Sequence, residues 1–150
     1  MADTLRTELL FEMTANLAEN PHRVGDAGRG DRTVVVVTGG TFEGPHLRGS
    51  VESVGGDWVV RRSDGVSELD VRALLRTDDG AEIHMSYGGY NHHQPLGPLG
   101  ELADGERYFR TQPRFETGDE RYQWLNRIVA IGDGRSDAPG TVSYRVYAVL

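Results

Sequence analysis

The sequence has no cysteine in its 150 residues, so disulfide bonds, thiolate nucleophiles and sulfur-ligated metals are excluded. It also has no apolar run of about 18 residues that could span a membrane. Its first 20 residues lack the apolar segment of a signal peptide. The net charge is −7 and no basic cluster is large enough for a nucleic-acid surface. We therefore expect one cytoplasmic domain over residues 1–150 that binds neither nucleic acid nor membrane.

A confident helical pattern is also missing, whereas glycine is abundant, with 20 residues placed between short β-rich runs. This spacing is typical of all-β sandwiches and barrels. The alternation of apolar and polar residues indicates about nine or ten strands. Sequential antiparallel strands in this number usually close, since closure removes exposed edges. The sequence predicts a single antiparallel β-barrel, similar in general architecture to lipocalins and streptavidin.

Two Asp-Gly pairs, Asp64-Gly65 and Asp79-Gly80, organise the middle of the chain. Asp-Gly between alternating apolar residues is a strong hairpin signal, because glycine accepts a positive φ without steric cost. Residues 55–87 are therefore expected to form a three-stranded meander. Residues 88–106 follow without any strand pattern, and a loop of this length is typical of a lid or a binding loop.

Several segments spread over nearly the whole chain form a specific combination. They include Gly39-Gly40-Thr41-Phe42-Glu43-Gly44-Pro45, Gly56-Asp57-Trp58, Leu69-Asp70-Val71-Arg72, Thr77-Asp78-Asp79-Gly80, Tyr108-Phe109-Arg110-Thr111, Phe115-Glu116-Thr117 and Trp124-Leu125-Asn126. Together these segments resemble the bacterial and fungal proteins catalogued as domain of unknown function 3237. The resemblance implies a single β-barrel of about this length but assigns no reaction, and some relatives occur in biosynthetic or aromatic-degradation settings. The segment Asn91-His92-His93-Gln94 lies outside the family pattern.

Charged residues alternate with apolar ones over residues 67–77, where Asp70 and Arg72 share one face of the predicted strand. In a sheet with one wet face these charges point to water. In a small barrel, a polar face turned inward creates a ligand-sized pocket. The family pattern includes both residues, so we expect several of its charged positions to point inward. The opposing interpretation is that Asp–Arg pairs only cross-link strands.

In an inward arrangement each residue type has a chemical use. Asp70 or Asp57 is the candidate general base if desolvation raises its pKa. Arg72 and Arg110 would hold a carboxylate or a developing oxyanion through bidentate hydrogen bonds. Flat apolar walls for an aromatic ring would complete the pocket. The candidate ligand-binding residues are Trp58, Tyr87, Glu116, Trp124 and Asn126, although both tryptophans are more typical of the core than of a pocket and Asp57 could instead shape a turn.

Metal and phosphate sites are not supported by the sequence. His92 and His93 are adjacent and would point apart in an extended chain, and the other histidines lie in separate segments. The glycine-rich loop at residues 25–30 lacks the following helix and the lysine of a phosphate-binding loop. We expect no metal and no cofactor, with His92 and His93 on the long loop.

Three functions remain compatible with these residues. The first is a cofactor-independent enzyme, of isomerase, cyclase or lyase type, acting on a small aromatic or enolisable molecule inside the barrel. The second is a barrel that binds such a ligand without turnover. The third is a structural barrel filled by its own side chains. A homodimer is compatible with all three.

Overall fold

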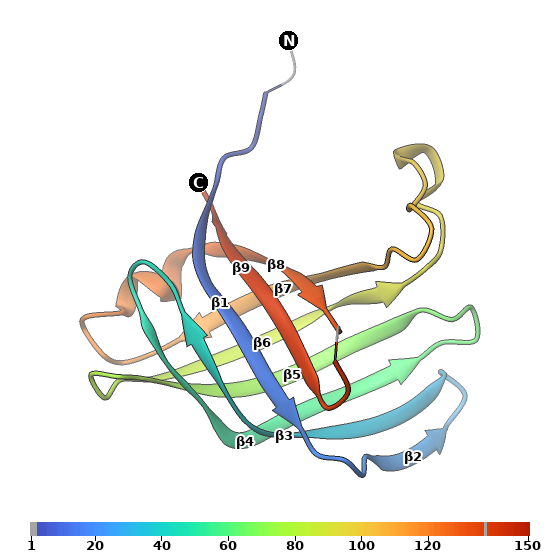
Figure 1. The fold of residues 1–150 in the computed structure, drawn as a ribbon, viewed down its shortest axis with the longest axis horizontal. Coiled ribbons are helices and arrows are strands. Elements are labelled where there is room, and N and C mark those ends of the chain that lie inside the picture. The colour runs from blue at the N-terminus through green and yellow to red at the C-terminus, as the bar shows by residue number, and fades with distance from the viewer. Residues whose placement is uncertain (1–2, 137) are drawn as a thin grey trace.

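The computed structural model describes residues 3–136 and 138–150, which form nine β-strands and two short 3₁₀ helices (Figure 1). No helix in these ranges is long and apolar enough to cross a membrane. In chain order the elements are β1 (Thr7–Leu17), β2 (His22–Asp26), β3 (Asp31–Glu43), β4 (Arg48–Arg61), β5 (Ser67–Thr77), β6 (Glu82–His92), η1 (Gly97–Leu99), β7 (Tyr108–Glu116), η2 (Gln123–Arg127), β8 (Val129–Arg135) and β9 (Thr141–Val149).

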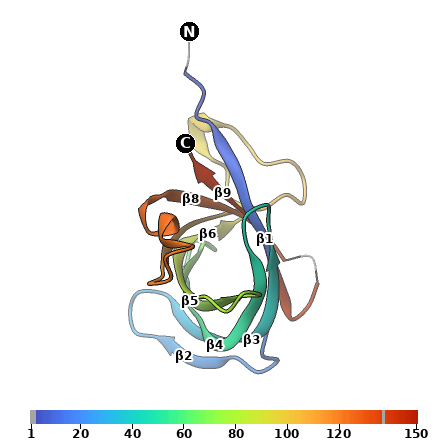
Figure 2. The same cartoon turned by 90° about the vertical axis from the view of Figure 1, so that its left-hand side faces the viewer.

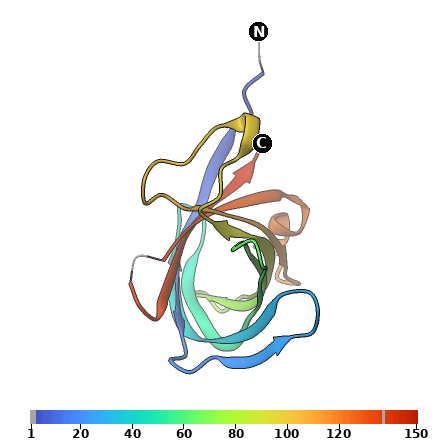
Figure 3. The same ribbon diagram turned by 90° about the vertical axis from the view of Figure 1, so that its right-hand side faces the viewer.

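The strands form one antiparallel sheet in the order β1-β9-β8-β7-β6-β5-β4-β3-β2. β1 also pairs with β3, so eight strands close into a barrel and β2 lies outside the closure as an extra strand along β3. Figures 2 and 3 look along the barrel from its two ends and show the ring of strands. The predicted all-β barrel is confirmed.

Both Asp-Gly pairs form tight turns, as predicted. The amide of Gly65 donates to the carbonyl of Arg62 at 3.0 Å, and the amide of Gly80 donates to the carbonyl of Thr77 at 2.9 Å. Both glycines have a positive φ, of 84° and 94°. These turns join β4, β5 and β6 into the expected meander and fix the register of β5 with both neighbours.

β4 is longer than the sequence pattern indicated, because residues 48–61 form one strand through Gly55 and Gly56. The register of β4 with β5 shifts between Val51 and Gly55. Gly55 has a φ of 92°, and a Cβ there would lie only 2.1 Å from the carbonyl oxygen of Arg72. A residue without a side chain therefore lets the two backbones approach while the register shifts. Asp57 consequently lies within a strand and does not shape a turn.

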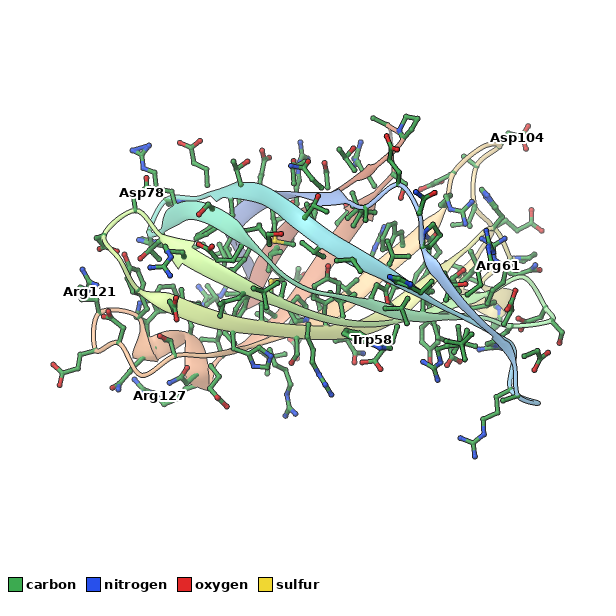
Figure 4. The ribbon with its side chains drawn as sticks, turned by 90° about the horizontal axis from the view of Figure 1, so that it is seen from below. Trp58, Arg61, Asp78, Asp104, Arg121 and Arg127 are labelled. Carbon is green, nitrogen blue, oxygen red and sulfur yellow. The ribbon has the colours of Figure 1, made fainter. Side chains whose placement is uncertain are left out.

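The two ends of the barrel are filled differently. Near the β3–β4 and β5–β6 turns, Phe11 packs edge-to-face against Phe42 and Phe115, with ring centroids 5.4 and 5.9 Å apart. All three rings are buried and close this end with an apolar plug. The opposite end leaves an internal cavity. Figure 4 shows the two ends, with Asp78 and Arg121 at the plugged end and Arg61 at the other.

The long loop begins later than predicted. β6 continues through His92, so the segment between β6 and β7 covers residues 93–107 and includes η1. His93 Nδ1 lies 3.1 Å from the carbonyl of Glu106, and the His92 ring stacks on Tyr108 at 5.1 Å. His92 and His93 therefore lie at the base of this loop. Figure 3 shows the loop at one end of the barrel.

Candidate ligand site inside the barrel

The charged face of β5 points outward. Val71, Ala73 and Leu75 are buried in the interior, whereas Asp70 and Arg72 are exposed. The prediction that these two charges point inward is wrong. Burying the aliphatic face of β5 stabilises the fold, whereas burying the charged face would require compensating partners for each ion.

Two further charged candidates also lie on the outside. Glu116 is exposed at the end of β7. Arg110 is exposed and donates to Asp133 on β8 at 2.9 Å, while its guanidinium lies 5.4 Å from the Tyr108 ring centroid. An Asp–Arg pair therefore does cross-link strands, but on the outer surface. The predicted inward position of Arg110 and Glu116 is wrong.

Asn126 and the two tryptophans do not line the cavity either. Asn126 exchanges two hydrogen bonds with the backbone of Thr117, both at 2.9 Å, and so fixes η2 to the end of β7. Trp124 packs half-buried against the hydrophobic core, with its ring 6.3 Å from the His46 ring. Trp58 is 39% exposed on β4. These three residues therefore lie outside the cavity.

The cavity measures about 160 Å³ and opens at the end of the barrel where β1, β4 and β6 finish. Its walls are largely aliphatic, which is typical of sites for small organic molecules. Tyr87 lines it, as predicted, and Asp57 is the one acidic side chain in the lining among the described residues. The lining residues are Ala15, Leu17, Val35, Val37, Asp57, Val59, Ser67, Leu69, Val71, Tyr87, Asn91, Phe109, Ser136, Val142 and Tyr144.

The register of the meander brings Asp57 and Tyr87 to one level of the barrel. Asp57 on β4 pairs with Val71 on β5, and Val71 pairs with Tyr87 on β6. Paired residues point to the same side of a sheet, so all three side chains enter the interior. The Tyr87 ring meets the Tyr144 ring of β9 edge-to-face at 5.2 Å. A carboxyl group and two phenols thus face one cavity.

The environment of Asp57 raises the pKa of its carboxyl group toward neutral pH. Burial raises the pKa of Asp57 from 3.8 to about 6. The amide of Asp70 donates to Oδ1 at 2.9 Å and lowers the pKa, the charge of Asp70 raises it, and the charge of Arg32 lowers it. No described side chain hydrogen-bonds to Asp57. The carboxyl group can therefore exchange a proton with a ligand at near-neutral pH.

The two tyrosines remain hydrogen-bond donors throughout the neutral range. Burial raises the pKa of both Tyr87 and Tyr144. The Tyr144 hydroxyl lowers the pKa of Tyr87, whereas the Tyr87 hydroxyl raises the pKa of Tyr144. The charge of Asp57 raises the pKa of both tyrosines. A protonated phenol can stabilise negative charge that develops on a ligand oxygen.

Asp57 and Tyr87 were among the residues predicted from the sequence, whereas Tyr144 was not. Val142, Tyr144 and Val146 alternate with polar residues in β9, and this pattern places Tyr144 on the apolar, inward face. The same test applied to β4 places Asp57 on one face with Val59. The opposite face of β4 carries Trp58 and Val60, so alternation alone does not show that the face with Asp57 is the buried one.

A larger hollow of about 830 Å³ lies on the outer surface over β5 to β8 and includes Asp70 and Arg72. It is an open groove, and the Asp, Arg and His residues along it are exposed. Water competes with a ligand for such groups. The interior cavity is therefore the stronger candidate for chemistry, because its acid is desolvated.

Comparison with known proteins agrees with the sequence resemblance. A family model described as "Protein of unknown function (DUF3237)" matches residues 5–149. The chain belongs to this family. A UPF0311 protein of Rhodopseudomonas palustris strain TIE-1 is 34% identical over 148 residues, which cover 95% of each chain.

Two further relatives extend the comparison to structure and activity. A β-barrel-like protein of Acinetobacter baumannii, known from a crystal structure, is 33% identical with a TM-score of 0.89 and covers 100% of this chain and 99% of its own. A protein of Penicillium herquei named hydroalkoxylation enzyme phnH is 28% identical over 126 residues, covering 83% of this chain and 72% of the relative.

Proposed function

We propose that the protein binds a small organic molecule inside the barrel and catalyses proton transfer on it without a cofactor, with Asp57 as the proton carrier. The observation that carries this proposal is a carboxyl group with a pKa of about 6 in an otherwise mostly apolar cavity. A group that titrates near the working pH is suited to both removing and returning a proton. Perturbed carboxyl groups in cavities are also enriched at catalytic sites.

The residues around Asp57 have compatible roles. Ionised Asp57 removes a proton from an acidic C–H or O–H of the ligand. The hydroxyls of Tyr87 and Tyr144 donate to the oxygen on which negative charge develops. Protonated Asp57 then returns the proton, at another carbon in an isomerisation or at an alkene carbon while an oxygen closes a ring. No electron is gained or lost, so no redox partner is required.

The relative from Penicillium herquei supports this class of chemistry. Hydroalkoxylation adds an alcohol across a carbon–carbon double bond, so that the oxygen bonds to one carbon and a hydrogen to the other. This needs one proton removed from oxygen and one delivered to carbon. A single acid–base residue can do both. In this proposal Asp57 replaces Asp70 as the base, and the tyrosine hydroxyls replace Arg72 and Arg110 as the oxyanion donors.

Deuterium incorporation tests the proposal without knowledge of the natural substrate. Cyclohex-2-enone, an enolisable one-ring compound, is incubated in D₂O, and loss of its exchangeable C–H signals is followed by NMR. Wild-type protein should accelerate exchange, with a rate that rises as Asp57 ionises through a pH of about 6. Asp57→Asn should remove about 100-fold or more of the acceleration.

Asp70→Asn is the control, since it removes an exposed carboxylate outside the cavity lining. It should keep the accelerated exchange, with the pH dependence moved to lower pH because the charge of Asp70 raises the pKa of Asp57. Equal exchange in wild type and Asp57→Asn would refute the catalytic role. Binding of the enone without any accelerated exchange would favour a ligand-binding barrel that performs no turnover.

A further inference from the structure

The cavity also indicates which ligands it accepts, an inference that rests on the binding site proposed above. Its volume of about 160 Å³ is close to that of an engineered protein cavity of ~150 Å³ that binds benzene. The cavity therefore has room for one six-membered ring. Fused ring systems would have to extend through the mouth, where Ser67, Asn91 and Ser136 lie.

The charge of the lining selects against anions. Asp57 lines the cavity, and no arginine or histidine does so among the described residues. The residues outside the described ranges, 1–2 and 137, are Met, Ala and Asp, so none has a basic side chain. A ligand carboxylate or phosphate would be brought against ionised Asp57 in a partly desolvated space whose lining has no basic side chain.

The basic residues near the site make their contacts elsewhere. Arg32 donates to the carbonyl of Trp58 at 2.6 Å, and Arg107 donates to Oδ1 of Asn91 at 2.6 Å. Neither arginine lines the cavity. Arg107 instead holds the amide of Asn91 at the rim, so its guanidinium has a partner before any ligand arrives.

The polar groups inside suit a neutral oxygen function. Asp57 and Tyr87 lie on strands two apart at the same register level, so their Cα atoms are about 10 Å apart across the cavity wall. A ring placed between them could direct one oxygen to the tyrosine hydroxyls and a second O–H or an acidic C–H to Asp57. We propose that the cavity selects uncharged, one-ring phenols or cyclic enones and rejects carboxylates of the same size.

Three probes of matched size test this selectivity. Binding of 4-methylphenol, toluene and benzoate to the 150-residue protein is measured by NMR titration at pH 7.5. We expect 4-methylphenol to bind more tightly than toluene, because its hydroxyl finds polar partners, and benzoate to bind at least ~10-fold more weakly than 4-methylphenol. Benzoate binding equal to or tighter than that of 4-methylphenol would overturn the proposal, as would failure of all three probes to bind.

Two variants locate the origin of the selectivity. Asp57→Asn removes the charge with almost no change in shape, so benzoate should bind at least ~10-fold more tightly than to wild type. Val59→Phe reduces the cavity at a half-buried position and should abolish binding of 4-methylphenol. Unchanged benzoate discrimination in Asp57→Asn, or unchanged 4-methylphenol binding in Val59→Phe, would contradict the proposal.

A measurement on wild type alone adds an independent check. Lowering the pH from 7.5 to 5 neutralises Asp57, so benzoate binding should tighten while 4-methylphenol binding stays constant. A benzoate affinity that does not change over this range would contradict the charge argument. If the probes show the expected selectivity but cyclohex-2-enone exchange is not accelerated, the ligand class stands and the catalytic proposal fails.

Discussion

Two aspartates at opposite ends of the barrel show how neighbours decide what a carboxyl group does. Asp79, in the turn between β5 and β6, accepts hydrogen bonds from the Thr77 hydroxyl at 2.5 Å and the Tyr122 hydroxyl at 2.8 Å and lies 3.1 Å from Arg121. These contacts lower its pKa. Asp57, in the cavity, has one backbone donor and a pKa of about 6. Asp79 is fully partnered and structural, whereas Asp57 is available to a ligand.

The two aspartates also link stability to pH in opposite directions. The depressed pKa of Asp79 stabilises the fold above its unfolded value, and this stabilisation is lost as pH falls through the folded pKa. The raised pKa of Asp57 means that the folded state holds a proton that the unfolded chain releases. Stability from this residue is therefore present below a pH of about 4 and is lost as pH rises to about 6.

The largest expected effect on stability comes from Asp57→Asn. A rise in pKa from 3.8 to about 6 means that ionised Asp57 destabilises the fold by about 3 kcal/mol. Removing the charge should raise the thermal midpoint at pH 8 by several degrees, with little change at pH 4. Thermal unfolding at both pH values measures this. A variant that is less stable than wild type at pH 8 would contradict the prediction that ionised Asp57 destabilises the fold.

Removing a hydrogen-bond donor of Asp79 should destabilise the protein, which is the opposite of the effect expected for Asp57→Asn. Tyr122→Phe keeps the ring but deletes the hydroxyl that donates to Asp79. The midpoint at pH 7 should fall by about 2–4 °C, and the loss should diminish in acid as Asp79 becomes protonated. Tyr90→Phe, at a tyrosine that is 48% exposed, is the control and should change little. Equal midpoints for both variants would remove the contrast between the two aspartates.

The smallest effect on stability is expected from Asp70→Asn. This variant tests whether the charge of Asp70 on the outer surface changes the pKa of Asp57 inside the barrel. The Asp70 side chain is exposed, so its removal should leave the thermal midpoint within about 1 °C. Its negative charge nevertheless raises the pKa of Asp57. The titration of Asp57, followed by NMR, should therefore move to lower pH in the variant. A large fall in the midpoint would show instead that Asp70 has a structural partner.

Much of the fold was predictable because it depends on local signals. The Asp-Gly pairs need a positive φ that glycine adopts at low cost, so both turns of the meander can be read from the chain. The period-2 alternation of β5 separates its residues into two sets. The lengths of β4 and β6 were underestimated, because Gly55, Gly56, Gly88 and Gly89 are typical of loops but here lie within strands.

The site was only partly predictable, because alternation does not say which set of residues faces the interior. Asp70 belongs to the charged set of β5, and the competing aliphatic set of the same strand occupies the core. Asp57 shares its face of β4 with Val59, and the closed barrel turns this face inward although Trp58 and Val60 lie on the other face. The sequence by itself determined the strands, the tight turns and a barrel without cysteine chemistry. The tertiary structure decided which carboxyl group loses its water, because desolvation depends on the strands that close around it.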